Sequence, residues 1–344
     1  MHLDGVIVEW LLVLVRVIAL FVITFLIVPY TVMAERWVCA WIQDRVGPNR
    51  TGPFGIMQPW ADALKLFLKE DIVPHHVRKV YYVIAPTLVF LPALLTMALM
   101  PWGSNLGPMS CVLADIGPGM LVVFAVSAFS VYGIVLAGWA SNSKYPFLGG
   151  VRSAAQLISY EVCIGLSLVA IFMQTQTLNL TQTVLYQASH GWLVWQQPLA
   201  ALLFLICMFA ETNRAPFDFP EAEQELVSGY NIEYSSLKFG LFFLGEYANM
   251  MVASMLLVTL FFGGWSLPFA PFNAPAQVWW VGLAHVAIFI AKTACMLFVY
   301  IWVRWTVPRF RYDQLMGLGW KVLFPLALVN ILITAVVLGL RGGA

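Results

Sequence analysis

The chain has 344 residues, of which 61% are hydrophobic and only 10% are charged, and its formal net charge is +1. So apolar a composition excludes an ordinary soluble globular protein, and the near-zero net charge argues against nucleic acid as a partner. The environment that suits such a chain is a lipid bilayer.

Eight apolar stretches are long enough to cross the hydrocarbon core of a membrane as helices, which takes about 20 residues. They are continuously apolar, unlike the short alternating segments of a membrane β-barrel. We therefore expect an all-α polytopic membrane protein that forms a single membrane domain over residues 1–344. The eight stretches are Val6–Val32, Tyr82–Met100, Gly117–Trp139, Ala154–Met173, Trp192–Ala210, Phe239–Phe262, Trp279–Trp302 and Val322–Leu340.

The basic residues alternate between the intervals that separate these stretches. The intervals Trp102–Gly117, Gln174–Pro198 and Gly263–Ala276 contain no Lys or Arg, whereas the others hold fifteen of the 18. Because basic residues between spans stay on the cytoplasmic side, this pattern predicts cytoplasmic basic loops and places both termini outside. The predicted cytoplasmic loops cover approximately residues 34–80, 140–154, 211–238 and 303–321.

The first basic loop contains a turn cluster at Gly47–Pro53, followed by an amphipathic pattern. Met57, Trp60, Leu64 and Phe67 recur at helical spacing and form one apolar face. The pattern predicts a helix lying in the headgroup plane, which serves either as an anchor or as a portal for an apolar ligand entering from the bilayer. The opposite face is polar and carries Gln58, Asp62, Lys65 and Lys69.

The third predicted cytoplasmic loop, residues 211–238, is strongly acidic, and Arg214 is its one basic residue before Lys238. Prolines and aromatic residues between the acids favour a packed loop over a solvated tail. Packing raises the pKa of some carboxyl groups through desolvation and like-charge repulsion, so that they can accept and pass protons. The acids of this loop are Glu211, Asp218, Glu221, Glu223, Glu225 and Glu233.

Ionisable residues inside the spans are costly and are therefore candidate functional groups. Glu161 and Glu246 lie about seven or eight residues into spans that begin on the basic side, roughly 10 Å deep. Lys292 lies near the middle of the seventh span. The alternative roles are a locally paired carboxylate for either acid and, for Lys292, the partner of one of them. His285 is expected to be a hydrogen-bonded core residue.

The cysteines argue against a metal centre or redox centre bound by this chain. All five are isolated, with no C-x-x-C spacing, so neither a zinc nor an iron–sulfur site is expected.

Several segments carry motifs that recur together in one family. They are Ala34–Arg36 with Ala40–Arg50, Gln58–Lys65, Ser141–Pro146, Ala210–Asp218, Gly245–Asn249 and Pro308–Leu315. Taken in order, they resemble the H-subunit family of the proton-pumping NADH–quinone oxidoreductase, respiratory complex I, which includes a mitochondrially encoded counterpart. The resemblance covers essentially the whole chain. It departs from the family pattern at Trp37, at Trp305 and, mildly, at Gly245.

This resemblance implies eight membrane helices with a surface helix, in a bacterial cytoplasmic membrane, and a quinone as substrate. It implies a quinone entry tunnel between the first helix, the sixth helix and the surface helix, and a carboxylate path for protons. FMN and iron–sulfur clusters would belong to partner subunits, and the partners would be the peripheral arm, small membrane-arm subunits and lipid. The implied tunnel residues are Arg36, Arg45, Asp62 and Phe217, the proton-path residues are Glu161, Glu211, Glu221, Glu223, Glu225, Glu233 and Glu246, and the residues for docking the peripheral arm are Arg309, Arg311 and Asp313.

Two other functions compete with this one. The membrane anchor of an energy-converting hydrogenase is of the same lineage, but the intact basic and acidic loops weigh against it. A stand-alone secondary transporter predicts internal repeats and helices broken at the midplane, and the sequence shows neither.

Overall fold

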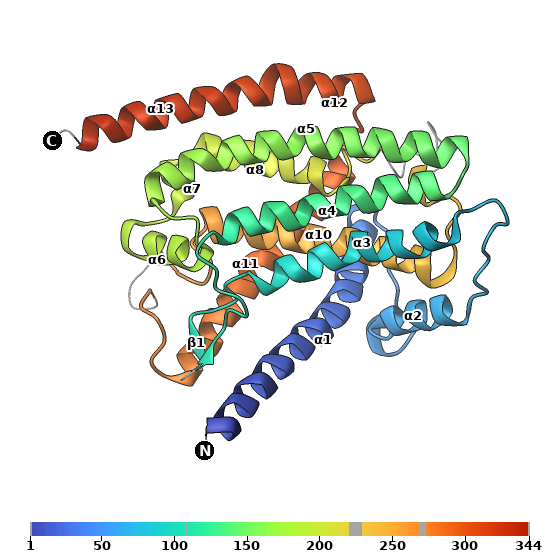
Figure 1. Cartoon of the computed structure of the whole chain (residues 1–344), viewed down its shortest axis with the longest axis horizontal. Helices are drawn as coiled ribbons and strands as arrows, with labels where there is room; N and C mark the ends of the chain where they lie inside the picture. The colour runs from blue at the N-terminus through green and yellow to red at the C-terminus, as the bar shows by residue number, and fades with distance from the viewer. Residues whose placement is uncertain (1, 107–108, 220–228, 269–272, 343–344) are drawn as a thin grey trace.

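The computed structural model describes residues 2–106, 109–219, 229–268 and 273–342, and almost all regular structure in them is helical (Figure 1). The long helices are α1 His2–Ile42, α3 Lys79–Ala98, α4 Gly119–Ala140, α5 Lys144–Thr175, α10 Ser236–Phe261, α11 Trp279–Thr306 and α13 Phe324–Gly342. The shorter elements are η1 Pro53–Gly55, α2 Gln58–Leu68, β1 Asn105–Leu106, β2 Met109–Ser110, α6 Leu180–His190, α7 Leu193–Gln196, α8 Pro198–Glu211, η2 Gly229–Asn231, α12 Tyr312–Leu318 and η3 Gly319–Leu323.

Seven helical segments in the described part of the chain are long and apolar enough to cross a membrane. Six correspond to α1, α3, α4, α5, α10 and α11, and the seventh runs through α12, η3 and α13 as one segment, Tyr312–Leu340. The prediction of a largely helical membrane protein is therefore confirmed.

The stretch predicted as the fifth span, Trp192–Ala210, is not one continuous helix. It divides into α7 and α8, and the backbone leaves the helical conformation at Gln197. The cause is Pro198, which has no N–H to donate and disfavours the helical conformation at the residue before it. α8 has 14 residues, about 21 Å at 1.5 Å per residue, so it is shorter than the seven candidate spans.

Two predicted cytoplasmic loops are much shorter than their predicted bounds. The loop expected at 140–154 is reduced to 141–143, because α5 begins at Lys144. The loop expected at 303–321 is reduced to 307–311, since α11 continues to Thr306 and α12 begins at Tyr312. The amphipathic helix predicted after the turn cluster is present as α2.

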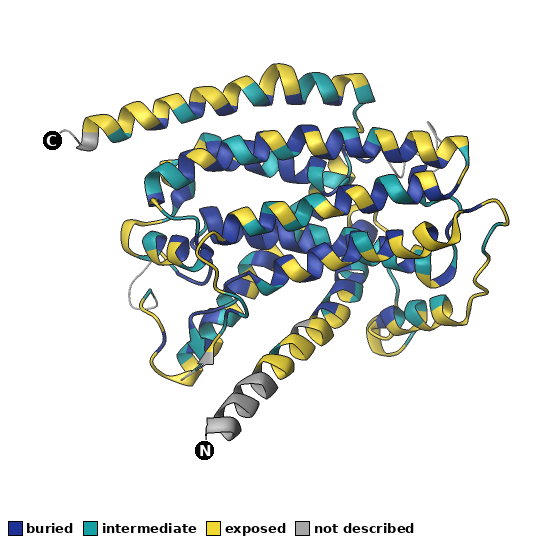
Figure 2. Ribbon diagram, in the orientation of Figure 1, coloured by how far each residue is buried: buried dark blue, intermediate teal, exposed yellow. Residues whose placement is uncertain are grey.

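The core forms where α3, α4, α5, α8 and α10 lie side by side, whereas α1 and α13 lie at the margins and expose much of their surface (Figure 2). Close approach depends on glycine at the crossing of α5 and η2. A Cβ atom at Gly149 would lie 2.6 Å from the Cα of Gly229, so a residue with a side chain does not fit at this position.

Helix α2 is fixed to the start of α10. The Ser236 hydroxyl donates to the carbonyls of Leu66 (3.0 Å) and Lys69 (2.9 Å) at the end of α2. Close by, the Lys238 ammonium pairs with Asp71 at 2.7 Å. Through these contacts the surface helix and α10 share one junction.

Candidate functional site

A cavity of about 370 Å³ lies between α1, α10 and α11. Its polar groups are few, chiefly the hydroxyls of Tyr30, Thr31 and Thr293. A site of this size and character suits an apolar organic molecule that carries a few polar atoms. The lining residues are Ile27, Tyr30, Thr31, Ala34, Val38, Trp102, Met251, Met255, Ile290, Thr293, Ala294, Leu297, Phe298 and Ile301.

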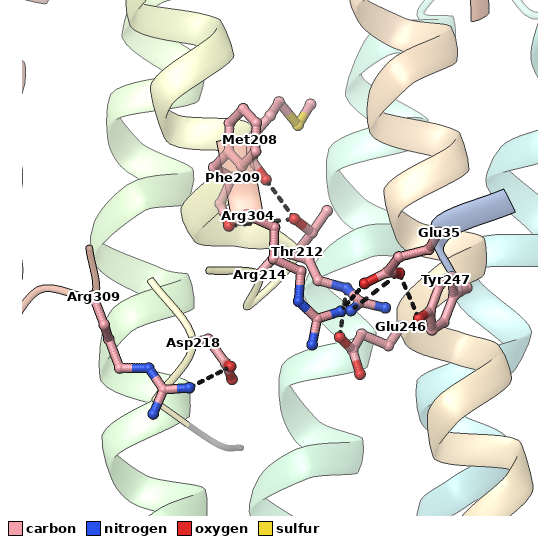
Figure 3. A network of polar contacts seen from close by, with 10 residues as sticks. All are labelled: Glu35, Met208, Phe209, Thr212, Arg214, Asp218, Glu246, Tyr247, Arg304 and Arg309. Atoms are coloured by element: carbon pink, nitrogen blue, oxygen red, sulfur yellow. Dashed lines mark hydrogen bonds and ion pairs between the residues drawn. The ribbon is translucent and has the colours of Figure 1, made fainter. Parts of the chain in front are cut away.

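A buried cluster of ion pairs joins the same three helices (Figure 3). Glu35 on α1 is ion-paired with Arg304 on α11, accepts a hydrogen bond of 2.6 Å from the Tyr247 hydroxyl on α10, and lies 3.8 Å from Arg214. Arg214 makes its shorter ion pair, 2.7 Å, with Glu246. Two carboxylates therefore face two guanidinium groups, a balance that buried charges require.

Arg214 is the centre of this cluster. Its side chain is only 3% exposed, and its guanidinium carbon lies 4.0 Å from the centroid of the Tyr247 ring. A planar guanidinium can stack on the ring and still direct N–H groups to two carboxylates, which an ammonium cannot do. Arg214 thereby joins Glu35 to Glu246.

The cluster lies directly beside the apolar cavity on all three helices. On α1, Glu35 lies one turn from the lining residues Thr31 and Val38, and on α10, Tyr247 lies one turn from the lining residue Met251. On α11, Arg304 lies one turn beyond the lining residue Ile301. Residues three or four apart on a helix are surface neighbours, so a ligand at this end of the cavity would lie next to the charges.

Two small cavities continue from the cluster into the bundle of α4, α5, α8 and α10, and the second has a mostly apolar lining with a few polar groups. One, of about 30 Å³, is lined by Glu246 and Glu211, and the other, of about 40 Å³, by Glu211 and Glu161. Ser130 and Asn249 line both. Each is large enough for one or two water molecules with several polar partners. The arrangement brings Glu246, Glu211 and Glu161 together in that order.

Of the other acids of the predicted proton path, the structure describes only Glu233. Glu221, Glu223 and Glu225 lie outside the described residues. Glu233 lies before α10, where its backbone carbonyl accepts a 2.6 Å hydrogen bond from the Tyr82 hydroxyl. Its neighbour Tyr234 stacks on Tyr82, and burial raises the pKa of the Tyr234 phenol above its ordinary value.

None of the four predicted tunnel residues lines the cavity. Arg36, near the C-terminal end of α1, pairs with Asp62 of α2 at 2.7 Å, and both are partly exposed. The Trp60 indole of α2 donates to the hydroxyl of the lining residue Tyr30 at 3.3 Å. Helix α2 therefore contacts the cavity wall through Trp60 and the end of α1 through Asp62.

The other two predicted tunnel residues have local partners. Arg45 donates to the Gln43 side chain (2.7 Å) and to the Cys39 sulfur (3.1 Å), which closes the turn after α1. Phe217 is buried and stacks on Phe310 with ring centroids 5.5 Å apart, so it lies in the core under the fourth loop.

The described part of the acidic loop, residues 212–219, is packed against the loop before α12. The amide of Phe310 donates to the carbonyl of Pro216 at 3.2 Å, and Arg309 pairs with Asp218 at 2.9 Å. Arg309, a predicted docking residue, therefore also holds these loops together. The other two, Arg311 and Asp313, have side chains that are 74% and 75% exposed.

Among the described residues Lys292 pairs with no acid, neither Glu161 nor Glu246, so that alternative role is wrong. Its ammonium donates to the carbonyls of Phe262 (2.7 Å), Gly264 (3.0 Å) and Ser266 (2.5 Å), which follow the end of α10. A cation at a helix C-terminus satisfies carbonyls that have no partner in the helix. His285, fully buried, lies 2.7 Å from the Ser104 hydroxyl and stacks on Trp265, as expected of a core histidine.

A family model described as NADH dehydrogenase matches residues 15–335. The chain belongs to this family. A relative from Flavobacterium psychrophilum, named as the H subunit of NADH-quinone oxidoreductase, is 46% identical and covers 94% of this chain and 96% of its own length. An H subunit of the same enzyme from Rhodospirillum rubrum is 49% identical over 90% of this chain and 88% of its own, and a protein from Rhodothermus marinus named subunit 8 is 49% identical over 88% and 90%.

Membership of the NADH dehydrogenase family confirms the resemblance drawn from the loop motifs. Together with the seven long apolar helices it identifies the chain as a multi-pass membrane protein. In the part of the chain that the structure describes, no group of three or more His, Cys, Asp or Glu residues could hold a metal ion.

Glu35, Tyr247 and Arg304 are site residues that the sequence patterns did not predict. In the sequence, Glu35 belongs to a recurring motif and Arg304 to a basic loop, and neither feature points to a buried ion pair. The signal that could have found them is their position. Each lies within a helix that continues an apolar stretch, where an ionisable group needs a partner.

Proposed function

We propose that this chain is the component of NADH–quinone oxidoreductase that admits quinone through the α1–α10–α11 cavity and transmits its reduction to a proton path. The observation that carries the proposal is the contact of this cavity with the Glu35–Arg214–Glu246 cluster. An apolar cavity alone suits many ligands. A cavity whose end is bounded by balanced buried charges suits a molecule that changes charge there.

The proposed membrane arrangement has eight spans. α7 and α8 together form the short fifth span, and the exposed apolar residues Trp60, Leu64 and Phe67 of α2 lie in the cytoplasmic headgroup layer. Both termini are then outside, in a bacterial cytoplasmic membrane. Quinone, being apolar, reaches the cavity from the bilayer past α2, whose Trp60 contacts the lining residue Tyr30.

In this proposal, coupling begins with the ion pairs that Arg214 makes with Glu35 and Glu246. A negative charge that develops on the ligand near Glu35 competes with the Glu35 carboxylate for Arg304, Tyr247 and Arg214, because charges in a low-dielectric site interact strongly. Any movement of Arg214 towards Glu35 weakens its ion pair with Glu246. Glu246 then binds a proton, which passes through water in the two small cavities to Glu211 and Glu161.

The partners follow from the exposed cytoplasmic groups. Arg311 and Asp313 present charges on the same side as the acidic loop, and we assign them to contact with the peripheral arm. FMN and iron–sulfur clusters belong to partner subunits in this proposal, and the small membrane-arm subunits receive protons from Glu161.

Ala294→Phe tests the cavity assignment. Phenylalanine in place of this lining residue takes up space in the cavity that quinone would occupy, so the KM for quinone should rise on the order of 10-fold or more in the assembled complex. Ala291→Phe makes the same change on the same helix at a residue that does not line the cavity, and it should leave the KM unchanged. Equal quinone kinetics in both variants would remove the assignment.

A further inference from the structure

Three basic residues converge where α3 and α5 begin and α4 ends. Arg78 immediately precedes α3, Lys79 is its first residue, and Lys144 is the first residue of α5. Hydrogen bonds hold the junction together: the Arg78 amide donates to the carbonyl of Ala140 at 2.9 Å. Two residues away on each side, the Asn142 side chain donates to the carbonyl of His76 at 3.1 Å. These contacts thus hold the three basic residues at one junction.

No described carboxylate compensates these charges. Among the residues that the structure describes, the ion pairs of Arg36, Lys238, Arg309 and the cluster around Arg214 involve none of the three. Arg78, Lys79 and Lys144 are all exposed. The junction therefore presents positive charge that is available to an external anion.

Arg78 is already held in an orientation that suits an anion. Its guanidinium carbon lies 4.2 Å from the centroid of the Trp139 ring, and Trp139 is in edge contact with Tyr81 at 5.3 Å. Stacking occupies one face of the guanidinium, while its N–H groups, which lie in the plane of the group, can still donate to a ligand. Those groups match two oxygens of a phosphate.

The surface next to the three cations is apolar. Val80 and Ile84 of α3 are 67% and 44% exposed, and Tyr132 of α4 is 64% exposed. Trp139, which stacks on Arg78, and Tyr81 belong to the same two helices, and such aromatic residues are enriched at membrane boundaries. A ligand that covers both regions must carry an anionic head and apolar tails.

We propose that this junction binds an anionic phospholipid of the cytoplasmic leaflet. Its phosphate lies between Arg78, Lys79 and Lys144, and its acyl chains lie along the exposed surface of α3 and α4. An acidic segment of a neighbouring protein would satisfy the charges but not the apolar surface that continues from them into three candidate spans. Basic pockets at the cytoplasmic ends of membrane helices are the usual sites for such headgroups.

The test uses the assembled complex in nanodiscs that contain a photoreactive phosphatidylglycerol or, separately, a photoreactive phosphatidylcholine at equal mole fraction. The anionic probe should label peptides covering 78–84 and 132–145 on the order of ten times more than the zwitterionic probe. Arg78→Gln combined with Lys144→Gln should abolish this preference. This comparison does not depend on activity, and the unmodified protein alone can decide it.

Lys321→Gln is the matched control, because Lys321 is likewise exposed and is next in sequence to an exposed tryptophan, Trp320, but lies outside the junction. It should leave labelling at the junction unchanged. Equal labelling by both lipids would overturn the proposal, as would a preference that survives the double variant. The proposal would also be overturned if no lipid labelled the junction and a zero-length cross-linker joined Lys79 or Lys144 to a neighbouring subunit.

Discussion

Arg214→Met should greatly reduce the amount of assembled complex. The change removes a buried guanidinium and leaves Glu246 without its 2.7 Å ion-pair partner in an environment that is only 15% exposed. Breaking a buried pair by removing one member costs about 3–5 kcal/mol, because the remaining charge is uncompensated. Native gels of the membranes and the unfolding temperature of the purified complex would measure the loss.

Two variants control this prediction. Arg36→Met removes an ion pair of the same length, 2.7 Å, but its side chains are 44% and 31% exposed, so it should cost at most about 1 kcal/mol. Arg214→Lys keeps the charge and should restore assembly in part, although an ammonium cannot bridge Glu35 and Glu246 while stacked on Tyr247. Equal assembly in Arg214→Met and Arg36→Met would show that the cluster does not support the fold.

Glu161→Gln and Glu211→Gln should each suppress proton translocation and quinone reduction together while leaving assembly intact. Glutamine preserves size and hydrogen bonding but cannot carry a proton. Neither acid belongs to an ion pair in the described part of the chain, so no buried cation loses its partner. Removing a positioned proton-transfer group typically slows the step on the order of 100-fold or more.

Proton uptake and NADH oxidation should be recorded in the same proteoliposomes. Glu161→Asp keeps an ionisable group and should recover part of both rates. Glu70→Gln changes an exposed acid on the surface and should behave as the unmodified protein. Unchanged pumping and unchanged turnover in both Glu161→Gln and Glu211→Gln would rule out the conduit.

Local patterns were enough to predict the helices and the acids. The apolar stretches located all the long spans, and the spacing of Trp60, Leu64 and Phe67 located α2, because both signals repeat within a short window. Glu161 and Glu246 stood out because each is a single charge within a span.

The contacts between these elements could not be predicted in the same way. Glu35 meets Tyr247 and Arg304 across 212 and 269 residues of sequence, and no local pattern records such a pairing. The alternative role of Lys292, as the partner of an acid within the spans, was wrong for the same reason. Its carbonyl ligands arise only because the chain after α10 turns back towards α11. The break before α8 was predictable in principle from Pro198, but the apolar run around it suggested a continuous span.

Photolabelling of the assembled complex with a short-chain azidoquinone, followed by mapping of the labelled residues, would locate the quinone itself. If quinone enters through the α1–α10–α11 cavity, labels should appear at lining residues such as Thr31, Met251 and Leu297 and should be lost in Ala294→Phe. Labels confined to other helices, or undiminished in Ala294→Phe, would contradict entry through this cavity.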